Sequence, residues 1–183
     1  MTTERGKVLL QIARAAIARA LGVTVAADET APWLAEQGAC FVTLTQYGEL
    51  RGCIGTLQAY QSLLDDVKKN AVAAALHDPR FAPLSAQKLG ITAIEISLLS
   101  PTQPIVFKNE ADALAQLRPG MDGIVFEYGH HRSTFLPQVW EQLPLPKQFM
   151  AHLKHKAGLP EDFWAADVKL SRYTVTKWHE EKG

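Results

Sequence analysis

The sequence has few of the residues and motifs that mark metalloproteins and disulfide-rich secreted proteins. Only two cysteines, Cys40 and Cys53, occur among 183 residues, so there is no disulfide framework and no CxxC pair of the kind that binds structural zinc. A single Cys40–Cys53 disulfide requires the two residues to meet on adjacent strands. An HExxH motif is also absent, and the histidine pairs 130–131 and 152–155 have no evident third ligand. We therefore expect no bound metal ion and no cofactor.

Charge and hydropathy argue against a nucleic-acid-binding, membrane or secreted protein. Nineteen Lys and Arg residues balance nineteen Asp and Glu residues, so no bulk field attracts nucleic acid or an anionic membrane surface. No run approaches the roughly 18 apolar residues that span a bilayer. Arg14 and Arg19 interrupt the apolar stretch near the N-terminus, whereas a signal peptide needs an uninterrupted one. These absences predict a cytoplasmic protein with neither nucleic acid nor a membrane as a partner.

What is present is the composition of a globular domain, with 47% hydrophobic and 21% charged residues. Helical periodicity predicts helices at 5–22, 63–78, 109–117 and 145–159, with Ser62 and Asn109 as caps. Alternating patterns predict hairpins at 39–57 and 123–136 and strands at 91–100 and 168–178. Because these elements follow no regular βαβ rhythm, we expect an α+β fold with a mostly antiparallel sheet packed by helices, in one domain covering residues 1–183.

The stretch GELRGCIGTLQ, residues 48–58, places a thiol, a guanidinium and small residues in one predicted strand. Alternate residues of a strand share a face, so Arg51 and Cys53 should lie on one face while Leu50 and Ile54 enter the core. A nearby guanidinium favours the thiolate, which would make Cys53 nucleophilic at neutral pH. The alternative is structural, because free cysteine often serves as a small buried hydrophobe.

Gly52 and Gly55 flank this cysteine. Glycine permits the backbone to approach a ligand or another chain segment closely. Glycines in strands also mark β-bulges, so a binding role and a structural role both stay open.

The segment HDPRFAPL, residues 77–84, is the second unusual stretch. Asp78 can accept hydrogen bonds from the turn that follows it, and Arg80 lies next to Phe81 in that turn. The structural alternative is a turn that ends the helix, with an Arg–Asp ion pair and Phe81 packed as an apolar plug.

A third polar group is predicted on the strand at 91–100. Glu95 and Ser97 share one face of it. A carboxylate in the middle of a strand needs water or a cation, and Arg51 and Arg80 are the natural cations. The structural alternative is an exposed sheet face.

Several motifs taken in order give the chain a resemblance to a known family. The motifs are LRGCIG (50–55), DPRFAPL (78–84), IEISLLSPTQPI (94–105), GIVFEY (123–128), STFLPQVWEQ (133–142) and HKAGLP (155–160). In this combination they resemble the AMMECR domain family, whose bacterial and archaeal members are called protein A of the AmmeMemoRadiSam system.

The resemblance implies a single α+β domain with a larger and a smaller lobe, and a cleft at the LRGCIG hexapeptide. It also implies a Memo-type protein, related to metal-dependent dioxygenases, and a radical SAM protein as partners, but no particular reaction. The chain departs from the family pattern at LPLPKQF (143–149), where a glycine-tryptophan stretch is more usual. It also has His155 where cysteine is frequent, which argues against a metal or redox role at that position.

Together these patterns predict a site whose chemistry depends on Cys53 as nucleophile or covalent carrier. Glu95 would orient the bound group or exchange a proton, and an arginine would hold a small anionic ligand through its planar fork of donors. The substrate-binding residues are predicted to be Arg51, Gly52, Gly55, Asp78, Arg80 and Ser97. The competing hypothesis is a non-catalytic binding or scaffold protein that docks one of the two partners.

Overall fold

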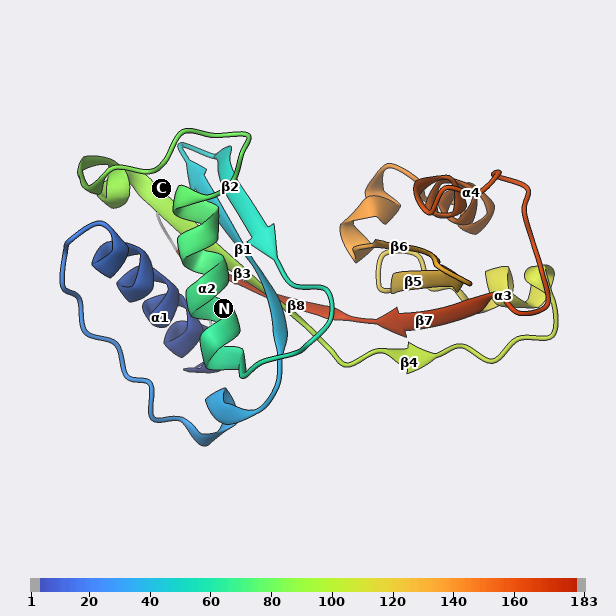
Figure 1. Ribbon diagram of the computed structural model, residues 1–183, viewed down its shortest axis with the longest axis horizontal. Coiled ribbons are helices and arrows are strands. Elements are labelled where there is room, and N and C mark those ends of the chain that lie inside the picture. Colours follow the sequence, from blue (N-terminus) through green and yellow to red (C-terminus); the bar gives the residue numbers. More distant parts are fainter. Residues whose placement is uncertain (1–3, 181–183) are drawn as a thin grey trace. The chain divides into compact units, whose positions relative to one another are not determined.

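The computed structural model describes residues 4–180 of the chain. Among these residues, 4–99 and 176–180 form one compact unit and 100–175 form a second. Each unit contains a four-stranded sheet packed by helices (Figure 1). The α+β class predicted from the sequence is confirmed.

The first unit has strand order β2-β1-β3-β8, and β1 pairs antiparallel with both β2 and β3. Its elements are α1 (Glu4–Ala20), the 3-10 helix η1 (Pro32–Ala35), β1 (Ala39–Gln46), β2 (Glu49–Gly55), α2 (Leu63–Leu76), the 3-10 helix η2 (Ala86–Ile91), β3 (Thr92–Leu99) and β8 (Val175–His179). As predicted, Ser62 caps α2, because its side chain accepts a hydrogen bond from the Asp65 amide.

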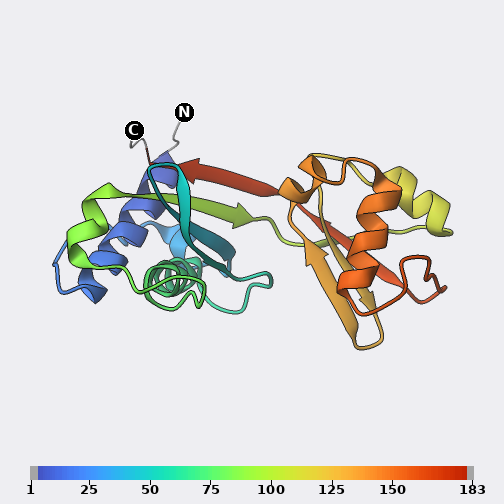
Figure 2. The ribbon, with the colours of Figure 1, turned by 90° about the horizontal axis from the view of Figure 1, so that it is seen from above.

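Helices α1 and α2 lie on one side of this sheet (Figure 2). The alternate residues Cys40, Val42 and Leu44 of β1 are fully buried against them, together with Ile94 and Ile96 of β3. Phe41, Thr43 and Thr45 therefore project from the opposite face and are only half-buried.

The second unit has strand order β4-β7-β5-β6 and its own hydrophobic core. Its elements are β4 (Gln103–Pro104), α3 (Glu110–Gln116), β5 (Gly123–Tyr128), β6 (His131–Phe135), the 3-10 helix η3 (Pro137–Glu141), α4 (Pro146–Lys156) and β7 (Lys169–Tyr173). Asn109 caps α3 as predicted. The rings of Trp140 and Phe149 stack in this core with centroids 3.8 Å apart.

The prediction of a single strand at 168–178 is wrong. The segment forms two strands that belong to different sheets, β7 in the second unit and β8 in the first. Thr174, between them, belongs to neither. Apolar and polar residues alternate in the same way in both halves of the segment. Periodicity therefore does not show that the chain passes from one sheet to the other at Thr174.

An extra residue near the start of β2 changes which side chains face the helices. Thr45 pairs with Leu50, but the next residue of β1, Leu44, pairs with Gly52. Arg51 is therefore the additional residue of a β-bulge. Between the turn and the bulge, the two-residue turn fixes which residues of β1 and β2 oppose each other. Beyond the bulge, each residue of β1 opposes the residue of β2 one position further along the chain.

This displacement decides where Cys53 lies. Without the bulge Cys53 would oppose Val42 and enter the core, but it pairs with Thr43 on the opposite face. The same displacement makes the prediction of a buried Leu50 wrong, because Leu50 is 46% exposed. The alternation used in the prediction fails at Arg51, where the strand gains a residue.

Behind the sheet, a buried carboxylate joins β1 and β2 to α2. The oxygens of Asp66 accept hydrogen bonds from the Cys40 amide at 2.9 Å, the Thr56 hydroxyl at 2.7 Å and the Asn70 amide group at 3.1 Å. Burial raises the pKa of the Cys40 thiol, and the Asp66 charge adds to this. Because Cys40 faces the core and Cys53 the other side, a disulfide between them does not form.

Candidate functional site

Cys53 belongs to a row of three side chains that crosses the first sheet. Thr43 of β1 pairs with Cys53 of β2 on one side and with Glu95 of β3 on the other. Directly opposed residues project from the same face, so the thiol and the carboxylate share the face that points away from α1 and α2. Their chemical roles stay predictions.

The hydroxyl of Thr43 is the contact of the thiol within this row. Thr43 Oγ1 lies 3.3 Å from Cys53 Sγ, a distance at which either atom can donate. Glu95 stands two strands away from Cys53, about 10 Å at the usual strand spacing. A proton passing between Glu95 and the thiol therefore needs Thr43, water or a bound ligand as an intermediate.

The predicted pairing of Glu95 with an arginine is not what the structure has. Arg80 pairs with Asp78, and Arg51 donates to a backbone carbonyl. Within residues 4–180, Glu95 makes neither an ion pair nor a side-chain hydrogen bond and is half-buried. Glu95 thus keeps its oxygens available for a ligand on this face.

The turn after α2 lies along the free edge of β2 and holds the backbone of Cys53. Asp78 Oδ2 accepts a hydrogen bond from the Cys53 amide at 3.0 Å, and Arg80 Nη2 is 3.4 Å from the Cys53 carbonyl oxygen. Both polar groups of an edge residue are thereby satisfied by side chains. The turn fixes the backbone position from which the thiol projects.

Asp78 is held as an anion by these contacts. Its carboxylate accepts from Arg80 Nε at 3.0 Å and Arg80 Nη2 at 2.7 Å. The Arg80 side chain, followed by the Cys53 amide, lowers the pKa of this carboxyl well below its usual range. The ion pair raises the pKa of Arg80 in return.

Arg51 is positioned by the same turn. Its Nη2 donates to the carbonyl of Ala82, and its guanidinium lies 5.6 Å from the centre of the Phe81 ring, which Arg80 approaches to 5.4 Å. Arg51 Nη1 is buried without a hydrogen-bond partner. No carboxylate of the described residues pairs with Arg51, so the two arginines and Asp78 leave one positive charge in excess.

The two glycines of the hexapeptide have packing reasons. A Cβ at Gly52 would overlap the carbonyl oxygen of Ala74 in α2, and a Cβ at Gly55 would overlap the ring of Phe41. Gly52 lets the helix approach the strand, and Gly55 makes room for an aromatic ring on the face of Cys53. The predicted ligand contacts of both glycines stay untested.

Ser97, the last of the predicted site residues, and the histidine pair of the second hairpin are placed as follows. Ser97 pairs with Phe41, which in turn pairs with Gly55, so Ser97 lies on the candidate face one row from Glu95 and is buried. His131 begins β6, and its Nδ1 lies 2.9 Å from the carbonyl oxygen of Ala157. In the described part of the chain, no three His, Cys, Asp or Glu side chains group closely enough to hold a metal ion.

Thr43 is the residue of the row that sequence analysis missed. It reads as an ordinary half-buried threonine, and the bulge that places it opposite Cys53 has no signal in the hairpin beyond the glycine after Arg51. Phe81 belongs to the turn that the sequence singles out, but its contact with the more distant Arg51 has no signal in the sequence.

The fold and this cysteine-centred face define a two-sheet α+β protein, and comparison with known proteins identifies its family. The chain matches the AMMECR1 family over residues 10–178 and belongs to it. It is 34% identical to protein MJ0810 of Methanocaldococcus jannaschii, covering 98% of this chain and 92% of that protein. A protein of Methanothermobacter thermautotrophicus is 32% identical, covering 99% of this chain and 97% of the relative.

A solved structure supports the same assignment. The crystal structure of protein PH0010 from Pyrococcus horikoshii superposes with a TM-score of 0.82 at 32% identity and covers 97% of this chain and 92% of that one. The family resemblance inferred from the ordered motifs is thereby confirmed. No helix among residues 4–180 is long and apolar enough to cross a membrane.

Proposed function

We propose that the protein is an enzyme-like component of a modification pathway, acting through Cys53 on a small anionic substrate. The observation that carries the proposal is the half-exposed thiol, hydrogen-bonded to Thr43 in a row that ends at Glu95. The thiol is the nucleophile or covalent carrier. Its backbone is fixed on both sides by Asp78 and Arg80, as a positioned nucleophile requires.

The excess positive charge at the turn after α2 supports an anionic substrate. Arg51 has no carboxylate partner in the described residues and keeps an unpaired donor, Nη1. Because Nη1 itself is buried, a carboxylate or phosphate group would meet the accessible part of this half-buried side chain and balance its charge. Glu95 would orient the substrate or exchange a proton with it, through Thr43 or directly.

The rate of Cys53 alkylation by iodoacetamide tests the nucleophile. At neutral pH, Cys53 should react faster than glutathione under the same conditions, with the site of modification read by peptide mass spectrometry. Cys40 provides the internal control, because it is fully buried and should stay unmodified in the folded protein. A Cys53 that reacts no faster than glutathione would contradict the proposal.

The alternative is a non-catalytic protein that docks a Memo-type dioxygenase-like protein or a radical SAM protein. Two observations favour it: Gly52 and Gly55 are explained by packing, and the hydrogen bonds of Asp78 go to the backbone and to Arg80. On this view the LRGCIG segment serves only to form a surface that fits the partner, and Cys53 is present because its side chain is small.

Binding and pathway assays with wild-type protein and Cys53→Ser separate the two functions. A scaffold should retain both the partner in pull-down and the pathway product when serine replaces cysteine, since the side chains are similar in size. A covalent carrier should keep the partner and lose the product.

A further inference from the structure

The same face of the first sheet carries a pocket of about 280 Å³ beside the row of Cys53. The first hairpin contributes Thr45, Tyr47 and Gly48 to its wall. The segment that enters β3 contributes Gly90, Ile91 and Ala93, and Glu180 closes the remaining side. Its size suits a single small ring rather than a drug-sized molecule.

Tyr47 is an unexpected residue at this position. It occupies the first place of a two-residue turn with φ of 52°, in the left-handed region, where Asn or Gly is favoured. Its side chain is 82% exposed, so burial of the ring does not compensate for the backbone strain. Strain without a folding benefit points to a role in binding.

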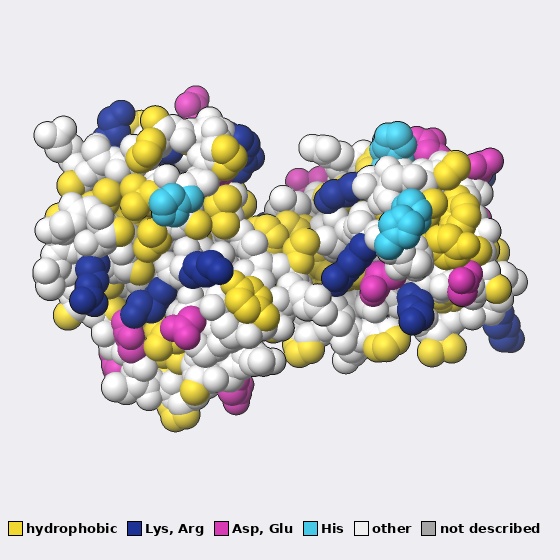
Figure 3. Space-filling model, viewed as in Figure 1, with side chains coloured by type: hydrophobic (Ala, Val, Ile, Leu, Met, Phe, Trp, Pro, Cys, Tyr) yellow, Lys and Arg dark blue, Asp and Glu magenta, His cyan; other side chains and the backbone are white. Residues whose placement is uncertain are grey.

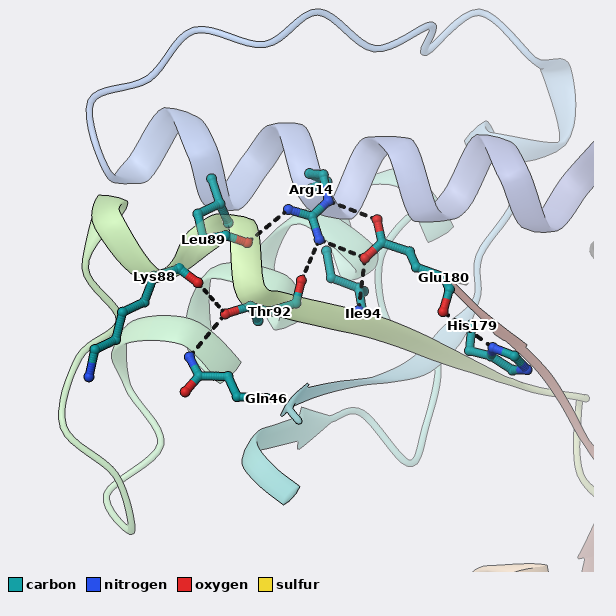
Figure 4. A network of polar contacts seen from close by, with 8 residues as sticks. All are labelled: Arg14, Gln46, Lys88, Leu89, Thr92, Ile94, His179 and Glu180. Carbon is teal, nitrogen blue, oxygen red and sulfur yellow. Dashed lines mark hydrogen bonds and ion pairs between the residues drawn. The ribbon is translucent and has the colours of Figure 1, made fainter. Parts of the chain in front are cut away.

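The charged residue at the pocket is already neutralised. Glu180 Oε1 accepts from Arg14 Nη2 at 2.6 Å and from the Ile94 amide at 2.9 Å, and Oε2 accepts from Arg14 Nε at 2.7 Å. Figure 4 shows Arg14 between Glu180 and the backbone carbonyls of Leu89 and Thr92. No unpaired charge among the described residues lines the pocket, so its occupant need not be charged.

We infer that this pocket binds an uncharged planar ring, stacked on Tyr47 and packed on Ile91 and Ala93, and that the ring is one end of the substrate of Cys53. Stacking on an exposed aromatic and contact with apolar side chains suit such a ring. The inference rests on the proposed function of Cys53 and adds a substrate class to it: a small molecule with an aromatic or similar planar end and an anionic end.

The register places the pocket within reach of Cys53. Thr45 and Ala93 oppose each other in the row next to that of Thr43 and Glu95, on the same face. Two residues along a strand and one strand across separate the pocket wall from Cys53 by roughly 8 Å. A molecule with one ring and a short chain spans that distance.

Paired maleimides test the inference with the intact chain. The rate of Cys53 modification by N-phenethylmaleimide is divided by that for N-ethylmaleimide, and the quotient is compared with the same quotient for glutathione. This comparison cancels the intrinsic reactivity of the thiol. The wild-type quotient should exceed that of glutathione by about tenfold, as for a ring that gains a binding contact.

Three variants assign the effect to the pocket. Ala93→Leu, which fills the pocket, should reduce the quotient to the glutathione value. Tyr47→Asn should reduce it while raising the thermal midpoint, because Asn tolerates the left-handed backbone. Gln87→Ala, an exposed change outside the pocket, should leave it unaltered. A wild-type quotient equal to that of glutathione, or one that Ala93→Leu leaves unchanged, would overturn the inference.

If Cys53 reacts with neither maleimide, the proposed function fails, and the pocket is judged separately by isoleucine-methyl NMR with benzyl alcohol. The pocket should then give a saturable shift of the Ile91 methyl that is lost in Ala93→Leu, while the methyl of the buried Ile17 stays in place. An Ile91 signal that does not saturate, or that moves no more than Ile17, would contradict the pocket itself.

Discussion

At the scale of single residues, Asp78 links the edge of β2 to the turn after α2. Its carboxylate accepts from the Cys53 amide and from Arg80, and these donors lower its pKa. A carboxyl whose pKa is lower in the folded than in the unfolded chain stabilises the fold while it is ionised. That stabilisation is fully present above its unfolded-state pKa of about 3.9 and is lost as the pH falls through the folded value.

Asp78→Asn should therefore lower the free energy of unfolding at pH 7 and should cost less as the pH is taken below about 4. Urea unfolding of both proteins at several pH values measures the difference. Asp167→Asn, at an exposed position, serves as the control and should show no comparable loss at pH 7. A penalty for Asp78→Asn that is the same at pH 7 and pH 3 would contradict the role of its charge.

At the scale of elements, the contact between α2 and β2 depends on the absence of a side chain at Gly52. A Cβ there would overlap the carbonyl oxygen of Ala74, and a backbone atom in a helix yields little. Gly52→Ala should lower the free energy of unfolding by about 1–3 kcal/mol, the usual cost of overpacking.

Gly90→Ala is the matched control for this substitution, since a Cβ at Gly90 meets nothing within 4 Å. It should alter stability little or raise it slightly, through the lower entropy of the unfolded chain. Equal losses from the two substitutions in urea unfolding would show that close approach to α2 does not explain Gly52.

The hairpin of β1 and β2 shows which features of the fold the sequence pattern predicts and which it does not. The hairpin over residues 39–57 was predictable, because apolar residues alternate with polar ones on both sides of its turn. A bulge is one of the two explanations that the sequence offers for Gly52 and Gly55, but its position at Arg51 follows only from the pairing with β1. Simple alternation therefore put Cys53 on the accessible face correctly and Leu50 in the core wrongly.

The Asp78–Arg80 turn shows the same limit. The sequence predicts its ion pair as the structural alternative, since Asp and Arg two residues apart in a turn can meet locally. The bond from the Cys53 amide to Asp78 spans 25 residues, and only the folded chain brings those groups together. The ion pair expected between Glu95 and an arginine does not form. Arg80 instead pairs with Asp78, and Arg51 donates to the carbonyl of Ala82.

At the scale of the whole molecule, the chain leaves the first unit after β3 and returns to it with β8. Ser100 and Thr174 are joined by two hydrogen bonds of 2.8 Å, from the Ser100 amide to the Thr174 carbonyl and from the Thr174 amide to Ser100 Oγ. The two crossing points are thus adjacent. Each unit also has a separate hydrophobic cluster.

Replacing residues 101–174 by a short Gly–Ser linker should therefore leave a first unit that unfolds cooperatively. Circular dichroism and tryptophan fluorescence during urea unfolding report the transition, with Trp33 and Trp178 as probes. The same shortened chain with Leu44→Asp, a change in the fully buried core, is the control and should be unfolded. A shortened chain without a cooperative transition would show that the first unit depends on the second.

The surface charge agrees with a small-molecule site more than with a broad electrostatic interface. The formal net charge at pH 7 is zero, and on the face seen in Figure 3 basic side chains are interspersed with acidic and hydrophobic ones. The local excess at Arg51 and Arg80 is accordingly the charge feature that the proposed function uses.

The central claim is that a reactive Cys53 and an unbalanced guanidinium act on the same anionic ligand. It is tested most directly by comparing alkylation of Cys53 by iodoacetate, which is anionic, and by iodoacetamide, which is neutral. The account predicts a rate ratio of iodoacetate to iodoacetamide above that of glutathione, which falls in Arg51→Gln and persists in Arg19→Gln, an exposed cation on α1. A ratio at Cys53 no higher than that of glutathione, or one unchanged in Arg51→Gln, would contradict it.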